Sequence, residues 1–167
     1  MLTRRQILNA SLVSLAALAV GNVLQTRLAR AANGDNGDVV TYTDAEWRKL
    51  LSADQYAVLR ESGTERPFTS ALLHETRAGT FACAGCDLPA FSSKTKFDSG
   101  TGWPSFWAPL ANAVSEKTDT SFGMTRTAVA CRRCAGHLGH VFDDGPKPTG
   151  LRYCMNGLAL KFIADAA

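Results

Sequence analysis

The pattern of hydrophobic and polar positions divides the chain into three parts. Residues 1–31 hold an almost unbroken apolar run after two adjacent arginines. Residues 44–63 form two short segments whose apolar side chains fall on one side of a helix. From about residue 80 onward, short apolar runs are separated by Gly, Pro, Asp and Ser. This change of periodicity predicts two helices followed by a domain built mainly of strands.

Two short helices are predicted by their start signals. Thr43 is followed three residues later by Glu46, and Ser52 is followed at the same distance by Gln55. In this capping box the hydroxyl accepts a hydrogen bond from an orphan backbone N–H of the first turn. Gly63 is the predicted end of the second helix, and we expect both helices to lie with their apolar sides against a larger body.

The predicted strands are short and antiparallel, because turn residues interrupt every apolar run after residue 80. The candidates are residues 79–82, 121–125, 127–131, 137–142 and 158–163. The sequence therefore predicts a mainly β fold with a few short helices packed at its N-terminal side.

The N-terminal segment, residues 1–31, has the anatomy of a bacterial export signal. Arg4 and Arg5 precede the apolar run, and residues 29–31 form a small-x-small cleavage pattern. The arginine pair resembles the twin-arginine type, which a receptor recognises. We expect cleavage after Ala31 and a periplasmic or otherwise exported protein; an uncleaved anchor helix is the alternative interpretation.

Composition supports one folded domain behind this segment. The chain has 167 residues and is 46% apolar, which suffices for one core; residues 32–42 form a polar leader and residues 43–167 the domain. Four of the 18 Lys and Arg residues lie in the export segment, which holds no acidic residue, so 14 remain against 15 Asp and Glu. A body with a charge of about −1 gives no footprint for nucleic acid. We expect a monomer that meets the membrane only through its export signal.

Four of the five cysteines form two C-x₂-C pairs, which predict a metal site. Two thiolates in one tight turn can bind a common ion, and two such turns complete a closed tetrahedral Cys₄ shell, most often around zinc. With four protein ligands the metal is structural. Disulfides are the alternative in an oxidising compartment, and a general thiol–disulfide oxidoreductase is a further one, although no thioredoxin-like pattern accompanies the pairs. The predicted ligands are Cys83, Cys86, Cys131 and Cys134.

The fifth cysteine, Cys154, lies in the stretch LRYCMNG without a second cysteine nearby. If residues 151–155 form a strand, Arg152, Cys154 and Asn156 share one face. A guanidinium beside a thiol favours the thiolate, so the pattern predicts a lowered cysteine pKa and a nucleophile. The alternative is a half-buried cysteine that acts as a small apolar residue.

Histidines and aromatic residues provide candidate partners for this thiol. His137 and His140 follow the second cysteine pair beside glycines, and histidine is a natural proton donor near neutral pH. Trp103 lies between Gly and Pro in the stretch GTGWPSFW, where it can wall a small apolar pocket, whereas Phe106 is expected in the core. Both histidines have a purely structural alternative.

Taken together, these stretches resemble the methionine-R-sulfoxide reductases of the B type, commonly called MsrB, over residues 47–162. The matching stretches, in family order, are TERPFTS, CAGCDLPAFSSKTKFDSGTGWPSFW, HLGHVFDDGPKPTGLRYCMN and ALKF. The resemblance implies a zinc-containing β-tent fold of antiparallel sheets, with one structural Zn²⁺ held by the four paired cysteines. It also implies proteins containing methionine R-sulfoxide as substrates.

The resemblance further implies a role for each candidate site residue. Cys154 matches the catalytic cysteine, which attacks the sulfoxide sulfur and becomes a sulfenic acid. Trp103 and Phe142 match substrate-binding residues. The histidines match groups that protonate or orient the sulfoxide oxygen, and the neighbours of the thiol match its supports; these residues are His137, His140, Arg152 and Asn156.

One position departs from the family pattern. Many members carry a recycling cysteine between the two glycines before the tryptophan, where this chain has Thr101. We therefore expect an external thiol, either a thioredoxin-like domain or a small thiol, to regenerate Cys154. The competing function is a non-enzymatic zinc-knuckle module that binds protein, which would have no need of a reactive Cys154.

Overall fold

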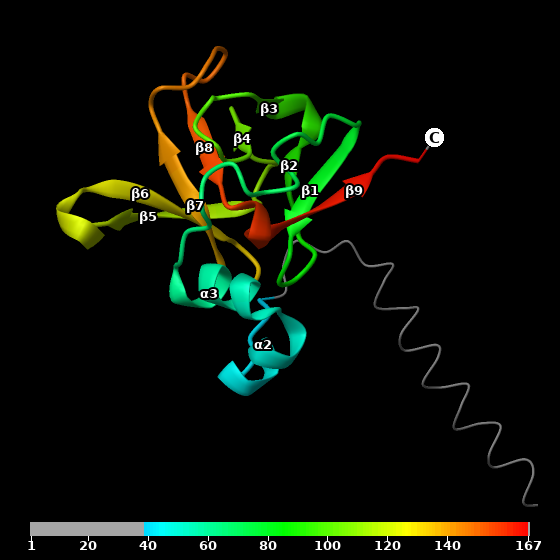
Figure 1. The fold of residues 1–167 in the computed structure, drawn as a ribbon, viewed down its shortest axis with the longest axis vertical. Helices are drawn as coiled ribbons and strands as arrows, with labels where there is room; N and C mark the ends of the chain where they lie inside the picture. The colour runs from blue at the N-terminus through cyan, green and yellow to red at the C-terminus, as the bar shows by residue number, and fades with distance from the viewer. Residues whose placement is uncertain (1–38, 167) are drawn as a thin grey trace, which may run out of the picture. The chain divides into compact units, whose positions relative to one another are not determined.

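The computed structural model describes residues 39–166, which form two antiparallel β-sheets with two short helices at one end (Figure 1). The export segment predicted for residues 1–31 and most of the leader lie outside the described residues. Among residues 39–166, no helix is long and apolar enough to cross a bilayer.

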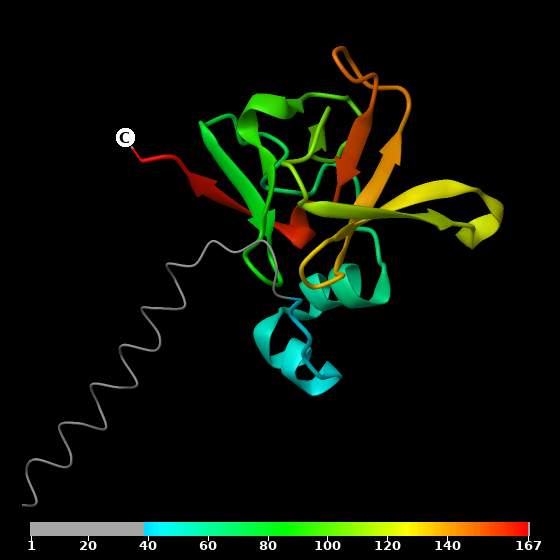
Figure 2. The ribbon, with the colours of Figure 1, turned by 180° about the vertical axis from the view of Figure 1, so that it is seen from behind.

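Both helices begin where the capping boxes predict. Helix α2 spans Asp44–Leu50 behind Thr43, helix α3 spans Ala53–Glu61 behind Ser52, and both boxes are complete in both directions. The predicted end of α3 is wrong by one residue, because Ser62 rather than Gly63 takes the left-handed conformation, with φ 58°. Figures 1 and 2 show both helices at the end of the sheets opposite the loop that joins β7 and β8.

The first sheet has three strands in the order β2-β1-β9. These strands are β1 (Gly79–Cys83), β2 (Pro89–Ser92) and β9 (Leu160–Ala164). The second sheet has six strands in the order β3-β4-β8-β7-β6-β5. Its members are β3 (Lys96–Phe97), β4 (Ser105–Phe106), β5 (Val114–Asp119), β6 (Arg126–Cys131), β7 (His137–Phe142) and β8 (Arg152–Met155). The predicted mainly β class is confirmed.

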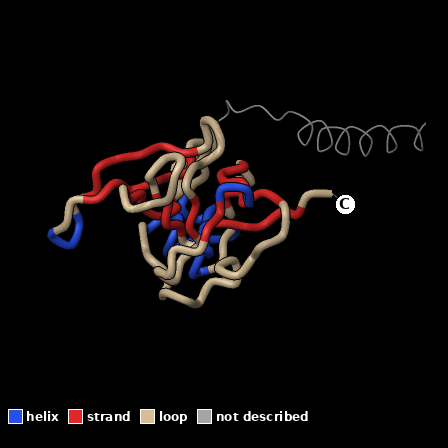
Figure 3. Tube along the Cα trace, turned by 90° about the horizontal axis from the view of Figure 1, so that it is seen from above, coloured by secondary structure: helices blue, strands red, loops and turns tan. Residues whose placement is uncertain are grey.

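Most predicted strands are confirmed, and two predictions need correction. Residues 121–125 do not form a strand, because Ser121–Gly123 is a 3₁₀ turn at the tip of the β5–β6 hairpin (Figure 3). The true strand β5 precedes it and escaped prediction because its sequence VSEKTD is largely exposed and carries no apolar alternation. The last strand begins at Leu160, after a second 3₁₀ turn at Gly157–Ala159.

Aromatic side chains between the two sheets form the centre of the core. The ring of Phe106 from β4 stacks on Phe91 from β2 at 4.5 Å and meets Phe81 from β1 edge-on at 5.0 Å. All three side chains have no exposed surface, so the core position predicted for Phe106 is confirmed. This cluster fixes β4, and through β4 it fixes the neighbouring strand β8 that carries Cys154.

Candidate active site and metal centre

The two C-x₂-C pairs converge into one cluster of four sulfur atoms. These atoms all lie within 4.8 Å of one another, with 3.7 Å between Cys83 and Cys134 and 3.5 Å between Cys86 and Cys131. A tetrahedral zinc ion with metal–sulfur bonds of about 2.3 Å requires sulfur–sulfur edges of about 3.8 Å. The cluster therefore has the donor set and the spacing of a closed metal shell, and all five thiols of the chain are free rather than paired in disulfides.

The same local geometry is built twice around this cluster. In the first turn, Asp87 N–H donates to the carbonyl of Cys83, and in the second, Ala135 N–H donates to the carbonyl of Cys131. Asp87 and Ala135 both take the left-handed conformation, with φ 66° and 56°. Arg60 of α3 donates to the carbonyl of Cys134 at 2.9 Å, so the N-terminal helices are tied to the metal site.

Cys154 is not part of that cluster and lines a small pocket on the second sheet. Strand β8 places it opposite Ser105 of β4 on one side and opposite His140 of β7 on the other. The pocket has a volume of about 120 Å³. Its walls are Thr64, Trp103, Arg126, Gly139, His140, Phe142, Cys154 and Asn156.

The protonation of the Cys154 thiol contradicts the sequence prediction. Burial raises its pKa above the ordinary value, and a hydrogen bond from Thr101 and the charge of Arg152 offset only part of this effect. The guanidinium of Arg152 is shared with Asp144, to which it donates two hydrogen bonds of 2.8 and 2.7 Å. Desolvation therefore outweighs the cation, and the free thiol is mainly protonated near neutral pH.

Thr101 connects the thiol to a short chain of hydroxyl groups. Its Oγ1 lies 3.8 Å from Cys154 Sγ and 2.8 Å from Ser99 Oγ, which in turn lies 2.7 Å from Ser105 Oγ. Thr101 thus lies beside the thiol, where it can donate a hydrogen bond to the thiolate.

His140 is held in one orientation by a carboxylate from β5. Its Nε2 lies 2.8 Å from Asp119 Oδ2, which also accepts a hydrogen bond of 2.7 Å from Arg126. Hydrogen bonds from Ser121 and from His140 hold the pKa of Asp119 well below its usual range, so this group is a carboxylate. An ionised carboxylate only accepts, so this hydrogen bond places a proton on Nε2 of His140.

His137 lies on the same side as His140 because of a β-bulge. The β6–β7 register passes from the Val129–Gly139 pair to the Ala130–His137 pair and skips Leu138, and the two rings meet at 5.2 Å. Burial lowers the pKa of His137 to about 4, so its ring is neutral at pH 7. His137 lines a second hollow beside the cysteine pocket rather than the pocket itself.

Trp103, which lines the pocket, is held by a close approach of two loops. Its Nε1 donates to the carbonyl of Glu65 at 3.1 Å, and Phe68 N–H donates to the carbonyl of Gly102 at 2.8 Å. A Cβ atom on Gly102 would lie 2.8 Å from Pro67, and its φ of 93° also favours glycine. These contacts hold the ring in place as one wall of the pocket.

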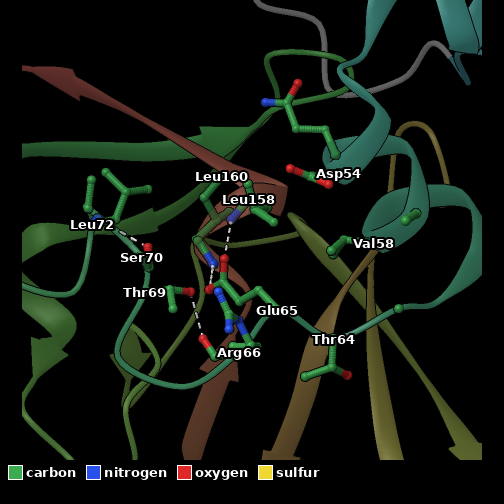
Figure 4. Close-up of a pocket in the computed structure, with 15 residues that line it drawn as sticks. Asp54, Val58, Thr64, Glu65, Arg66, Thr69, Ser70, Leu72, Leu158 and Leu160 are labelled. Atoms are coloured by element: carbon green, nitrogen blue, oxygen red, sulfur yellow. Dashed lines mark hydrogen bonds between the residues drawn. The ribbon is translucent and has the colours of Figure 1, made fainter.

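Asn156 positions this loop from the opposite side. Its amide oxygen accepts from Glu65 N–H at 3.0 Å and its amide nitrogen donates to the Leu138 carbonyl at 3.2 Å. The Glu65 carboxylate in turn accepts from the backbone N–H groups of Gly157 and Leu158, as Figure 4 shows. A hollow of about 740 Å³ lies along this side of the loop and contains none of the residues predicted for catalysis.

The structure thus assembles most of the predicted site. Trp103, His140, Phe142, Cys154 and Asn156 line one pocket. Arg152 lies beside it, with its guanidinium 4.4 Å from the ring centre of Phe142. Sequence reasoning missed four charged residues, Glu65, Asp119, Arg126 and Asp144. No local signal marks Asp119, which comes from a strand that was itself not predicted.

Comparison with known proteins places the chain in a large group of relatives. The SelR domain model matches residues 51–164. A peptide methionine sulfoxide reductase MsrB from Pseudomonas putida is 60% identical over 118 residues, which cover 70% of this chain and 89% of the relative. MsrB proteins from Bradyrhizobium diazoefficiens and Thiobacillus denitrificans are 58% and 59% identical, over 74% and 72% of this chain and 90% and 92% of theirs.

Proposed function

The chain belongs to the SelR-domain family of peptide methionine sulfoxide reductases, MsrB, and from this premise we propose that Cys154 reduces peptide-bound methionine R-sulfoxide through a sulfenic acid. Membership of this family supports the general activity, that of an oxidoreductase acting on methionine sulfoxide. The observation that supports Cys154 as the reacting group is that it lines one pocket together with Trp103, Phe142 and His140.

In the proposed reaction the oxygen atom moves from one sulfur to the other. The Cys154 sulfur attacks the sulfoxide sulfur and forms a transient sulfur–sulfur bond. The oxygen then bonds to the Cys154 sulfur as S–OH, and both the substrate's sulfur–oxygen bond and the sulfur–sulfur bond break, so that methionine leaves as a thioether. The substrate sulfur is reduced by two electrons and the cysteine sulfur is oxidised by two. No other redox group is needed for this half of the cycle.

The proton for the oxygen comes from the thiol itself. Because burial raises the pKa of Cys154, the group enters the reaction mainly as S–H. His140 stands opposite Cys154 in the β7–β8 pair, and because its Nε2 is bonded to Asp119, Nδ1 is the ring nitrogen that we assign to the thiol proton. His140 takes the thiol proton and delivers it to the oxygen, on which negative charge grows. The reaction therefore starts from a neutral thiol and a sulfoxide and ends with a neutral sulfenic acid and a thioether.

Two aromatic residues give the pocket its selectivity for a thioether. Trp103 and Phe142 present apolar surfaces to the methyl group and the polarizable sulfur, whereas His140 is the donor for the oxygen. A fixed apolar wall and a fixed donor at different sides of one sulfur atom distinguish the two oxygen configurations. Preference for the R form follows from the family resemblance.

The resting thiol is regenerated from outside the chain. The other four cysteines are gathered in the metal cluster, and Thr101 rather than a thiol approaches Cys154. An external thiol, from a thioredoxin-like domain or a small molecule, attacks the sulfenic sulfur and releases water. A second thiol then frees Cys154 by disulfide exchange.

The metal of the cysteine cluster is, in this proposal, one structural zinc ion. Four thiolates close its coordination shell, so the ion supplies folding free energy and takes no part in the reaction. The export segment adds the cellular setting: the enzyme repairs oxidised methionine in exported proteins, in the periplasm or beyond. Mass determination of the N-terminus after expression in a bacterial host tests export, and an intact residue 1 on protein retained in the cytoplasm contradicts it.

A single-turnover experiment without added reductant tests the activity. The metal-loaded protein receives each diastereomer of a blocked methionine sulfoxide separately, beside Cys154→Ser. We expect about one equivalent of methionine from the R form only, and none from the variant. No product from either form would refute the reductase and favour a binding module.

A further inference from the structure

A second hollow adjoins the cysteine pocket along the same face of the second sheet. It has a volume of about 510 Å³ and shares Thr64, Arg126 and His140 with the cysteine pocket. The larger hollow is therefore within reach of a substrate chain whose methionine sulfoxide occupies the small pocket.

The register of the sheet sets the distance between the two. Cys154, His140, Ala128 and Lys117 stand opposite one another on four adjacent strands, β8, β7, β6 and β5. With strands about 4.8 Å apart, Lys117 lies about 14 Å across the sheet from Cys154. At one end of this row Cys154 lines the small pocket, and at the other end Lys117 lines the larger hollow.

Lys117 gives this hollow one positive charge that has no acidic partner among the described residues. Within residues 39–166, Lys117 forms no ion pair, and its neighbour Glu116 bonds to Tyr153 instead. The acid of the hollow, Asp119, already accepts from Ser121, His140 and Arg126. Its charge is therefore matched, and that of Lys117 is not.

Two buried nitrogen atoms in the same hollow also have no hydrogen-bond partner. They are Nε of Arg126 and Nε2 of His137, and His137 is only 7% exposed. Buried polar atoms of a folded protein are nearly always paired, so these two nitrogen atoms beside an unpaired lysine indicate a place for a polar partner. A carboxylate matches the charge of Lys117 and is an acceptor for the Arg126 Nε–H.

We propose that this hollow is a subsite for an acidic side chain of the substrate protein, an Asp or Glu close in sequence to the oxidised methionine. The inference rests on the proposed reductase function, because it assigns the neighbour of the residue being reduced. Residues of an extended chain are about 3.3 Å apart. A Glu two or three positions from the methionine sulfoxide then starts about 7 to 10 Å away, and its side chain reaches Lys117.

The test compares matched peptides on the full-length, metal-loaded enzyme. Each blocked peptide carries one methionine R-sulfoxide in a Ser/Gly background, with Glu or Gln at position −3, −2, +2 or +3. We measure the ratio of kcat/KM for the Glu peptide to that for the Gln peptide at each position. A partly exposed ion pair predicts a ratio of about two to five at low ionic strength for at least one position. From 0.01 M to 1 M salt the Debye length falls from about 30 Å to about 3 Å, and the ratio should fall to about one.

Variants at one lysine identify the hollow. We expect Lys117→Gln to bring the ratio to about one and Lys117→Glu to bring it below one, whereas Lys49→Gln, a charge change on exposed α2, keeps the wild-type ratio. Turnover of all peptides with a ratio of one at every position overturns the subsite and leaves the reductase intact. A preference that survives Lys117→Gln also overturns it. Absence of turnover on the Gln peptides contradicts the reductase itself, and the subsite falls with it.

Discussion

Replacement of Thr101 by valine tests whether its hydroxyl stabilises the reactive thiolate. The change keeps the β-branched shape and removes the donor 3.8 Å from Cys154 Sγ. A hydrogen bond to a charged group contributes about 1.5 to 3 kcal/mol, and a long contact to sulfur belongs at the lower end. Because about 1.4 kcal/mol corresponds to one pKa unit, we expect Thr101→Val to raise the Cys154 pKa by about one unit.

The expected change in rate is smaller than the change in thiolate population. At a fixed pH below the pKa, one unit lowers the thiolate fraction about tenfold, but the more basic thiolate is the better nucleophile, with a Brønsted coefficient of about 0.4 to 0.5. Alkylation by iodoacetamide near neutral pH should therefore slow about three- to fourfold, while its pH midpoint moves up by about one unit.

The assay follows alkylation against pH on metal-loaded protein, in which the four cluster cysteines are protected. Cys154→Ser gives the background from other sites. Thr127→Val is the matched control, since Thr127 of β6 lies opposite Val141 and outside the cysteine pocket. An unchanged midpoint in Thr101→Val would show that burial and Arg152 set the pKa without the hydroxyl.

Three further predictions concern recycling, metal and pH. Thr101→Cys should convert the sulfenic acid of Cys154 into an internal disulfide within one turnover, detected by peptide mass mapping, whereas the wild type should yield a sulfenic acid that dimedone traps; an internal disulfide in the wild type would refute external recycling. Removal of the metal by a chelator, or Cys131→Ser, should unfold the domain, which circular dichroism detects. Zinc binding to four thiolates contributes about 10 to 16 kcal/mol, whereas the net stability of a domain is about 5 to 15 kcal/mol. A folded metal-free protein would contradict a structural ion. Between the ordinary histidine pKa near 6.5 and the value of about 4 for His137, the unfolded state binds more protons than the folded state, so lowering the pH through this window should remove about 2 to 3 kcal/mol of stability. The free energy of unfolding, measured with denaturant at several pH values, should depend less steeply on pH in His137→Gln. An equal dependence on pH in the variant and the wild type would refute the buried neutral ring.

Local chemistry explains what the sequence determined. A capping box is complete within four residues, so Thr43 and Ser52 marked both helix starts without any knowledge of the fold. The C-x₂-C pairs likewise carry their turn geometry in their spacing, which predicted the four cysteines that the structure brings together. The four stretches that match the family pattern marked Cys154, Trp103 and His140 as candidate site residues, and the structure brings these three into one pocket.

Tertiary structure decided the properties that depend on distant neighbours. The sign of the Cys154 pKa shift depends on how much protein covers the thiol and on Asp144 sharing the charge of Arg152, and neither can be read from a strand pattern. The tautomer of His140 depends on Asp119, 21 residues earlier, in a strand whose exposed surface gives no apolar signal. His137 and His140, three residues apart, share a face only because Leu138 is skipped in the β6–β7 register. Each of these depends on which chains lie side by side, and packing rather than local propensity sets that arrangement.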